Sequence, residues 1–191
     1  MSLRAALAPR SVAIIGASEN PNKIGGRPLR YLLRFGYEGA VYPVNPTHEF
    51  VQGVRAFSQL SELPEVPDVA VIAVPSEAAL AAVRDCAARG VRLAVVMSSG
   101  FAETADDAAV ANQRELVRLA RGTGMRIVGP NSQGLATFST GAVLSFSTMF
   151  SDEEPSDGPV AIVSQSGIMG VVPYALLRRR RVGVRYAHPT G

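Results

Sequence analysis

The segment IIGASENPNKIGG, residues 14–26, runs from an apolar stretch into small and hydroxylated residues. Gly16 permits a tight turn after a strand, and Ala17 and Ser18 keep the backbone approachable. Lys23 follows within reach of a bound phosphate. This pattern predicts a phosphate-binding loop at the end of a strand.

The segment PVAIVSQSGIMG, residues 159–170, repeats this arrangement near the end of the chain. The first N–H groups of a helix have no partner inside the helix and lie at the positive end of its dipole, so they attract anions. We therefore expect the hydroxyls of Ser164 and Ser166 and the N–H groups of Gly167 and Ile168 to hold a phosphoryl group.

Short β-branched runs alternate with helical patterns, so these loops are expected to follow buried strands. Strands that are buried on both faces and separated by helices form a parallel sheet. The sequence therefore predicts an α/β fold with a Rossmann-like, doubly wound parallel sheet. The expected strands cover 12–15, 40–44, 69–74, 93–97, 126–128 and 160–163.

The expected helices cover 26–36, 76–90, 104–122 and 166–178. Leu29, Leu32 and Leu33 are expected together on one apolar face of the first helix. Ser76 is expected to cap the second helix, and Gly90 is expected to end it. Pro173 falls about two turns into the last helix, where the missing N–H removes a hydrogen bond and favours a kink.

The composition changes at 151–158, SDEEPSDG, which is acidic and polar and ends in glycine, as inter-domain linkers do. A strand, a helix and a further strand over 182–187 follow it, which together make one βαβ unit. The sequence predicts a domain over 1–150, a linker over 151–158, and the N-terminal βαβ part of a second α/β domain over 159–191.

The composition excludes several classes of protein. With 191 residues, 47% of them hydrophobic, the chain is long enough to bury a core. A formal charge of +3 and 6% aromatic residues with no Trp give no reason to expect nucleic acid. No apolar run is long enough to span a membrane, and Pro9 and Arg10 interrupt any signal-peptide core. The single Cys86 fits the reducing cytoplasm.

Ligands of open α/β sheets bind beyond the carboxyl ends of the strands. Five successive strand ends carry small, hydroxylated, Gly or Pro residues, which predicts a cleft for a long, phosphorylated, nucleotide-like ligand. The first loop lacks the second glycine of G-x-G-x-x-G, and the second strand ends at Val44-Asn45-Pro46 without the acid that NAD prefers. Both NADP and coenzyme A carry a phosphate on the adenosine ribose, and the pattern leaves both open.

Six segments occur in the order and spacing of the NDP-forming acyl-CoA synthetases: SVAIIGASENPNKIGG, GAVYPVNP, PDVAVIAVP, VVMSSGFAET, RIVGPNSQG and PVAIVSQSGIMG. Together they extend over nearly the whole chain. The chain therefore resembles the α subunit of succinyl-CoA synthetase and, more closely, the acetate-CoA ligase (ADP-forming) branch of that family.

The resemblance implies a CoA-binding Rossmann-like domain followed by the start of a flavodoxin-like ligase domain. It also implies a reaction in which a carboxylic acid, CoA and ATP give acyl-CoA, or the reverse, through acyl phosphate and phosphohistidine. The remaining ligase and ATP-grasp domains, in the same chain or in a second subunit, would bind ATP or ADP with Mg²⁺.

The resemblance also assigns residues at the five strand ends. The first loop would hold the CoA phosphates, the next two strand ends would line the adenosine, and the last two would face the pantetheine arm and the acyl group. In that order the residues are Gly16, Ala17, Ser18 and Lys23; Val44, Asn45, Pro46, Val74 and Pro75; and Ser99, Gly100, Phe101, Glu103, Pro130, Asn131 and Ser132.

The family's phosphohistidine lies further along the ligase domain, so we expect no catalytic residue, no metal site and no activity of this chain alone. By the resemblance, the helix after VSQSG points its N-terminus at that histidine. His48 would touch the adenosine 3′-phosphate or lie solvated in its loop, and His188 is not expected to be the phosphohistidine. Two alternatives remain: a CoA-sensing module fused to a protein acetyltransferase, and an NAD(P)-binding protein.

Overall fold

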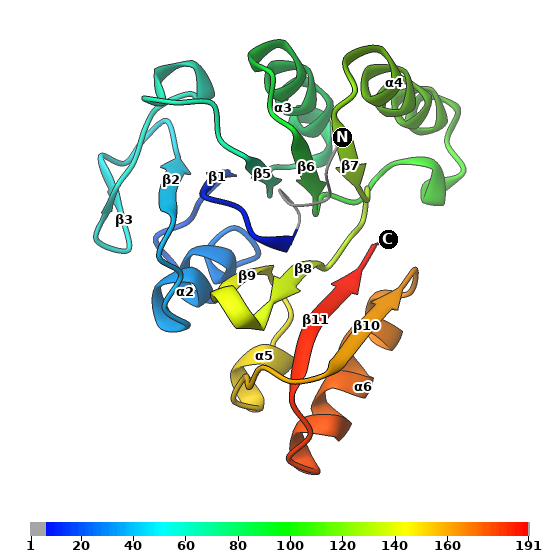
Figure 1. The fold of residues 1–191 in the computed structure, drawn as a ribbon. Coiled ribbons are helices and arrows are strands. Elements are labelled where there is room, and N and C mark those ends of the chain that lie inside the picture. Colours follow the sequence, from blue (N-terminus) through cyan, green and yellow to red (C-terminus); the bar gives the residue numbers. More distant parts are fainter. Residues whose placement is uncertain (1–6, 191) are drawn as a thin grey trace.

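The computed structural model describes residues 7–190. Residues 1–6 and 191, which the predicted domain ranges include, lie outside the described residues. The chain forms a five-stranded sheet, called the first sheet, and a four-stranded sheet, called the second sheet. Figure 1 shows helices α3 (Ser76–Arg89) and α4 (Asp107–Thr123) above the first sheet and the second sheet at the opposite end of the molecule.

The first sheet contains the five predicted parallel strands, each within two residues of its predicted bounds. They are β1 (Ser11–Ile15), β2 (Ala40–Val44), β5 (Val69–Ile72), β6 (Leu93–Val96) and β7 (Arg126–Val128). The order is β2-β1-β5-β6-β7, and every neighbouring pair is parallel. This confirms the Rossmann-like, doubly wound α/β fold, and the strand order reverses between β1 and β5.

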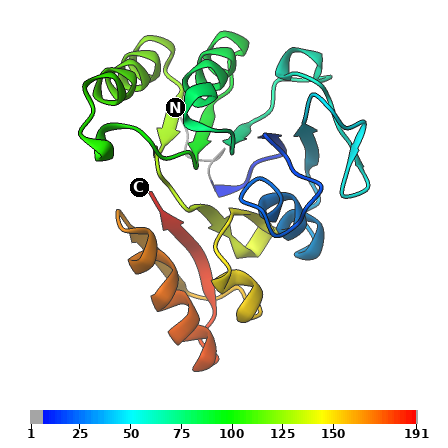
Figure 2. The ribbon, with the colours of Figure 1, turned by 180° about the vertical axis from the view of Figure 1, so that it is seen from behind.

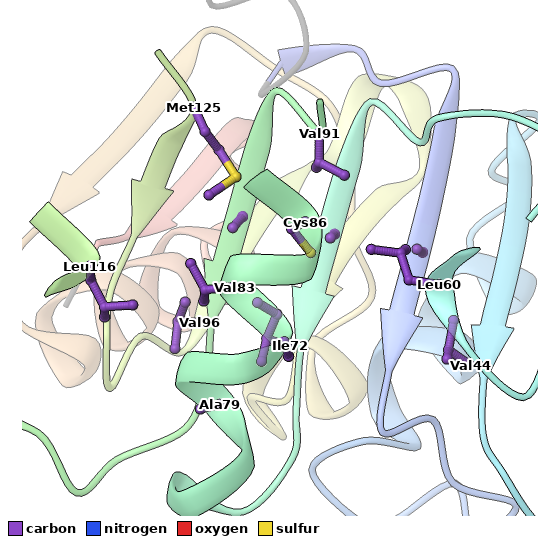
Figure 3. Packing of buried hydrophobic residues seen from close by; sticks show 14 of the residues in the cluster. Val44, Leu60, Ile72, Ala79, Val83, Cys86, Val91, Val96, Leu116 and Met125 are labelled. Atoms are coloured by element: carbon purple, nitrogen blue, oxygen red, sulfur yellow. The ribbon is translucent and has the colours of Figure 1, made fainter. Parts of the chain in front are cut away.

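Helices cover both faces of the first sheet, because its central strands present apolar side chains on each side. On one face, Ile72 and Val96 pack with Ala79, Val83 and Cys86 of α3 (Figure 3). The Cys86 thiol is fully buried, and this burial raises its pKa to about 12, which suits a packing residue. On the other face lies helix α2 (Arg27–Arg34), with short 3-10 helices elsewhere at Leu60–Glu62, Ala102–Thr104 and Phe138–Thr140.

Three details of the predicted helices are wrong. Ser76 is the first residue of α3 and makes no capping bond, because Pro75 occupies the N-cap position. Helix α4 begins later than predicted, where the Asp106 carboxylate accepts from the Ala109 N–H at 3.0 Å. On the predicted apolar face of the first helix, Leu29 and Leu32 are buried, but Leu33 is 51% exposed. Gly90 ends α3 in the left-handed conformation, as predicted.

The second sheet has the order β10-β11-β8-β9. Strands β10 (Val160–Ser164) and β11 (Val184–Pro189) are parallel and are joined by α6 (Gly167–Arg179), so the predicted βαβ unit is confirmed. Helix α6 continues through Pro173. The hairpin of β8 (Gly134–Thr137) and β9 (Ala142–Ser145) was not predicted, and β8 pairs with β11 in antiparallel fashion. Figure 2 shows α6 along the outer side of this sheet.

The predicted linker, 151–158, makes ion pairs with residues that precede it and with residues that follow it in the sequence. Its first residues end helix α5 (Met149–Asp152), and its acidic side chains form surface ion pairs, each of which contributes little alone. The pairs are Glu153 with Arg179, Glu154 with Arg34, and Asp157 with Arg185, at N–O distances of 2.7, 2.9 and 3.0 Å. Since β8 and β11 share a sheet across this segment, the division at 150 remains a prediction.

Candidate functional site

A cleft of about 1120 Å³ opens beyond the carboxyl ends of β1, β5 and β6. It lies where the strand order of the first sheet reverses, which is the usual ligand position in open α/β sheets. Its size suits a large ligand, since most small-molecule sites measure about 300–1,000 Å³. Eight of the residues predicted to bind CoA line it: Gly16, Ala17, Ser18, Lys23, Asn45, Val74, Pro75 and Ser99.

The first loop turns sharply out of β1 at Gly16. This residue has φ +86°, and a Cβ there would lie 2.6 Å from the Ala73 carbonyl oxygen. The N–H groups of Gly16 and Ala17 both donate to the Val44 carbonyl, at 3.1 and 3.3 Å. Only glycine therefore fits this position, and the turn fixes the loop against both neighbouring strand ends.

Asn45 joins the loop after β2 to the loop after β1. Its Nδ2 donates to the Ala17 carbonyl at 2.9 Å, and its Oδ1 accepts from the Thr47 N–H at 2.8 Å. The Thr47 hydroxyl also lies 2.8 Å from His48 Nδ1, and the His48 ring is exposed on the cleft wall. A side chain that was predicted to contact a ligand thus also holds two loops in place.

The side chain of Gln52 holds the first loop by hydrogen bonds, and this role was not predicted. It sits at the turn between β3 (Phe50–Val51) and β4 (Val54–Arg55), with φ +49°. Its Nε2 donates to the carbonyls of Ser18 and Gly26, at 2.9 and 3.0 Å. The available signal was a glycine-containing pair, Gln52-Gly53, between two short segments that each contain a valine, and glycine is typical of a tight hairpin turn.

The backbone of the first loop uses its own donors. Besides Gly16 and Ala17, Ser18 donates to the Gly25 carbonyl, and Lys23 donates to the Asn20 carbonyl at 3.2 Å. These N–H groups are therefore not directed at a ligand, in contrast to a loop that cradles phosphate with its backbone.

Positive charge reaches the cleft instead from side chains and from a helix start. Lys23, the only lysine in the sequence, and Arg27 both line it. The first N–H groups of α3, at Ser76 and Glu77, lie at the cleft without a side-chain cap, so they attract an anion. Two carboxylates also line the cleft, at Glu77 and at Glu19, and that of Glu19 accepts from the Gln52 N–H.

Two predicted residues of the acyl end have buried side chains. Phe101 is 1% exposed and packs in the core beside α3. Ser132 is fully buried, and its hydroxyl donates to the Pro189 carbonyl at 2.6 Å. In this structure both side chains face the protein interior, and their part in CoA binding remains a prediction.

Glu103 shapes the loop after β6 rather than lining the cleft. Its carboxylate accepts from the N–H groups of Gly100 and Phe101, at 2.7 and 3.1 Å. Although partial burial acts to raise it, the backbone N–H groups of Glu103, Gly100 and Phe101 together hold the pKa of this carboxyl below its usual range. A carboxylate therefore holds this loop at neutral pH.

The remaining predicted CoA residues also lie off the cleft lining. Val44 is buried and contributes its carbonyl to the first turn, while Pro46 is exposed. Asn131 is exposed, with φ +55°. Pro130 lines a separate hollow beside β7.

The predicted phosphoryl site lies at the start of α6. The Ser166 hydroxyl accepts from the Met169 N–H at 3.4 Å and caps the helix, and the Ser164 hydroxyl accepts from the Ser166 N–H at 3.1 Å. The Gly167 and Ile168 N–H groups are the first two of the helix, so they have no intrahelical acceptor. The structure thus brings these four residues together.

His188 lies on β11 beside this segment, in register with Val163. It is 9% exposed, and its Nε2 has no hydrogen-bond partner in the described chain. Burial lowers the pKa of the imidazole to about 4, so the ring is neutral at pH 7.

The parallel sheet and the cleft at its switch point define a Rossmann-like domain for a nucleotide-sized ligand. The family model described as "CoA binding domain" matches residues 10–137, and this chain belongs to that family. In 7–190, no helix is long and apolar enough to cross a membrane.

The chain is similar to acyl-CoA-forming enzymes. It is 38% identical over 175 residues to the alpha subunit of an ADP-forming acetate-CoA ligase of Pyrococcus furiosus, covering 90% of this chain and 37% of that one. It is 34% identical over 186 residues to a trans-feruloyl-CoA synthase of an unknown prokaryotic organism, covering 97% and 26%.

A solved structure of a dinucleotide forming acetyl-coenzyme A synthetase 1 of Ca. Korarchaeum cryptofilum, in complex with phosphate and ADP, matches with a TM-score of 0.89 and 36% identity. The match covers 100% of this chain and 39% of that one. The chain thus spans between a quarter and two fifths of the length of these relatives.

Proposed function

We propose that this chain is the CoA-binding part of an NDP-forming acyl-CoA synthetase and that CoA binds in the cleft of the first sheet. One observation carries the proposal: the cleft opens where the strand order of the first sheet reverses, within the region matched by the CoA-binding family model. The cleft also lacks an acid at the end of β2, where NAD would need one, since Asn45 occupies that position.

In the proposed pose, Lys23, Arg27 and the start of α3 hold phosphates, because these groups bring positive charge to the cleft. The adenosine end lies beside Asn45 and His48. Val74 and Pro75 lie beside the adenosine as well, and the pantetheine arm then runs past Ser99, which follows the neighbouring strand β6. The first loop supports the ligand by shape, since the N–H groups of Gly16, Ala17 and Ser18 are bonded to carbonyls of the protein.

The parent reaction is proposed to join a carboxylic acid to CoA with ATP, through acyl phosphate and a phosphohistidine carried by further ligase and ATP-grasp domains. The start of α6 would hold the phosphoryl group, because its first N–H groups can stabilise charge that develops during transfer. We place the parent protein in the cytoplasm, since its only thiol in this chain is a buried, unpaired Cys86.

The single lysine allows a direct test of CoA binding. An amine-reactive reagent labels only Lys23 and the N-terminal amine, and peptide mass spectrometry separates the two. CoA is expected to slow labelling of Lys23 while leaving the N-terminal amine unchanged, and 3′-dephospho-CoA, NAD and NADP are expected to protect less. Protection by NADP and not by CoA would refute the proposal.

A second prediction concerns chemistry. With ATP, Mg²⁺, acetate and CoA, this chain is expected to form no acyl-CoA and to retain no labelled phosphate, because the phosphohistidine is proposed to lie in another part of the parent protein. Scintillation counting of the precipitated protein measures this. Retained label on His188 would contradict the assignment of that residue.

A further inference from the structure

A second hollow, of about 550 Å³, runs along the open edge of β7, between this strand and α4. None of its lining residues lines the CoA cleft, and one of them, Pro130, was assigned to CoA by the resemblance alone. It therefore lies apart from the proposed CoA pose, and nothing in the proposed function assigns it a role.

The floor of the hollow is apolar. Leu116 of α4 and Met125, just before β7, are each 2% exposed and form part of the floor, with Ile127 of the strand beside them. Val117 is 45% exposed at the same hollow. Since Leu116 and Met125 are already buried, an apolar ligand body would remove mainly the surface of Val117 and Ile127 from water.

The rim of the hollow is positive. Arg121 and Arg126 line it, and within residues 7–190 neither guanidinium has a carboxylate partner within 4 Å. By contrast, Arg118 of the same helix forms an ion pair with Glu115. Two unpaired guanidinium groups beside an apolar floor favour a ligand with one anionic head.

We propose that this hollow binds an organic carboxylate with an apolar body, of the size of a medium-chain fatty acid. The carboxylate lies at Arg121 and Arg126, and the chain lies over Leu116, Met125 and Ile127. The volume falls within the range of about 300–1,000 Å³ that is typical of small-molecule sites.

Other occupants fit less well. A second copy of the chain that presented the same face would bring the arginines of the two copies together. An extended peptide would need a free strand edge, but β7 has three residues, and the next N–H, that of Gly129, already donates to the Thr190 carbonyl at 2.9 Å.

The test is a methyl NMR titration of the whole chain with sodium octanoate. Saturable shifts are expected at the methyl groups of Leu116, Met125 and Ile127, and an excess of CoA is expected to leave them unchanged. Arg121→Glu and Arg126→Glu are each expected to weaken binding about tenfold or more, because each removes a charge-assisted contact.

Arg114→Glu is the matched control. Arg114 lies two turns before Arg121 on the same helix, lines a neighbouring hollow and not this one, and carries the same charge. The control is expected to retain octanoate affinity within about twofold. Three results would overturn the proposal: no saturable shift up to about 10 mM octanoate, displacement of octanoate by CoA, or equal losses in all three variants. Ala120→Phe, which fills the hollow, is expected to abolish the shifts while the remaining spectrum stays folded.

Discussion

Replacing Gly16 by alanine tests whether the turn after β1 is fixed by sterics or only by backbone conformation. Gly16 and Gly90 have almost the same φ, +86° and +83°. A Cβ at Gly16 would lie 2.6 Å from the Ala73 carbonyl oxygen and 2.9 Å from Val74 Cγ1, whereas a Cβ at Gly90 would meet nothing within 4 Å. Both substitutions therefore strain the backbone at a positive φ, but only Gly16→Ala also brings a Cβ into close contact with neighbouring atoms.

The shared term is about 1–2 kcal/mol of unfolding free energy, since an L side chain is strained in the left-handed region. The gain from stiffening the unfolded chain, about 0.4–1 kcal/mol, offsets part of it equally in both variants. Gly16→Ala must also displace a backbone carbonyl, and such overpacking costs about 1–3 kcal/mol. We expect Gly16→Ala to lose about 1–3 kcal/mol more than Gly90→Ala.

Urea unfolding followed by circular dichroism measures both losses, and equal m-values would show that the two variants unfold from comparable states. Calorimetric titration then measures the affinity of each variant for CoA. Gly16→Ala is expected to weaken CoA binding, because the displaced loop carries Lys23, while Gly90→Ala, at the far end of α3, is expected to bind as the parent chain does. Equal free-energy losses in the two variants would refute the steric argument.

Two further predictions concern Asn45 and His188. Asn45→Ala is expected to cost about 1–2 kcal/mol and to weaken CoA binding in calorimetric titration, because it leaves the Ala17 carbonyl and the Thr47 N–H without partners; unchanged CoA affinity would contradict this, and Asn112→Ala, exposed on α4, is the control. In the folded chain the pKa of His188 is about 4, below the ordinary 6.5, so protonation of this ring favours the unfolded chain. The free energy of unfolding therefore falls as the pH falls from about 6.5 towards 4. Between pH 7 and 5 the free energy of unfolding, measured with urea, is expected to fall by about 2 kcal/mol through this residue. His188→Leu is expected to make the free energy of unfolding less dependent on pH in this range; an unchanged pH dependence would contradict the low pKa of His188.

The first sheet was predictable because its signals are local. Each strand is a short β-branched run, and burial on both faces leaves few polar residues to obscure the pattern. The hairpin β8–β9 was missed because its strands carry glycine, threonine and serine and are stabilised by a partner, β11, that lies about 50 residues further along the chain. Strands β3 and β4 have two residues each, which is too short for a periodicity.

The candidate site was predictable at the level of loops and less so at the level of atoms. Small residues after each strand indicated where a ligand would lie, and the cleft opens there. The sequence alone does not say which groups already have partners. The first loop was expected to hold the CoA phosphates, but three of its backbone N–H groups already have acceptors in the protein. Those of Gly16 and Ala17 donate to the Val44 carbonyl, and that of Ser18 donates to the Gly25 carbonyl.

The cleft is also anchored to the second sheet through α2, which begins at the cleft wall. Arg27 Nη1 donates to the Phe146 carbonyl at 3.1 Å, and the Tyr31 hydroxyl donates to the Ser147 carbonyl at 2.7 Å. Tyr31 is fully buried among side chains of α5 and α6. Arg27 lines the cleft with the same side chain that reaches Phe146. The positive charge proposed to meet the CoA phosphates is therefore held in place by the chain that follows β9, so the second sheet helps to position the ligand-binding face of the first.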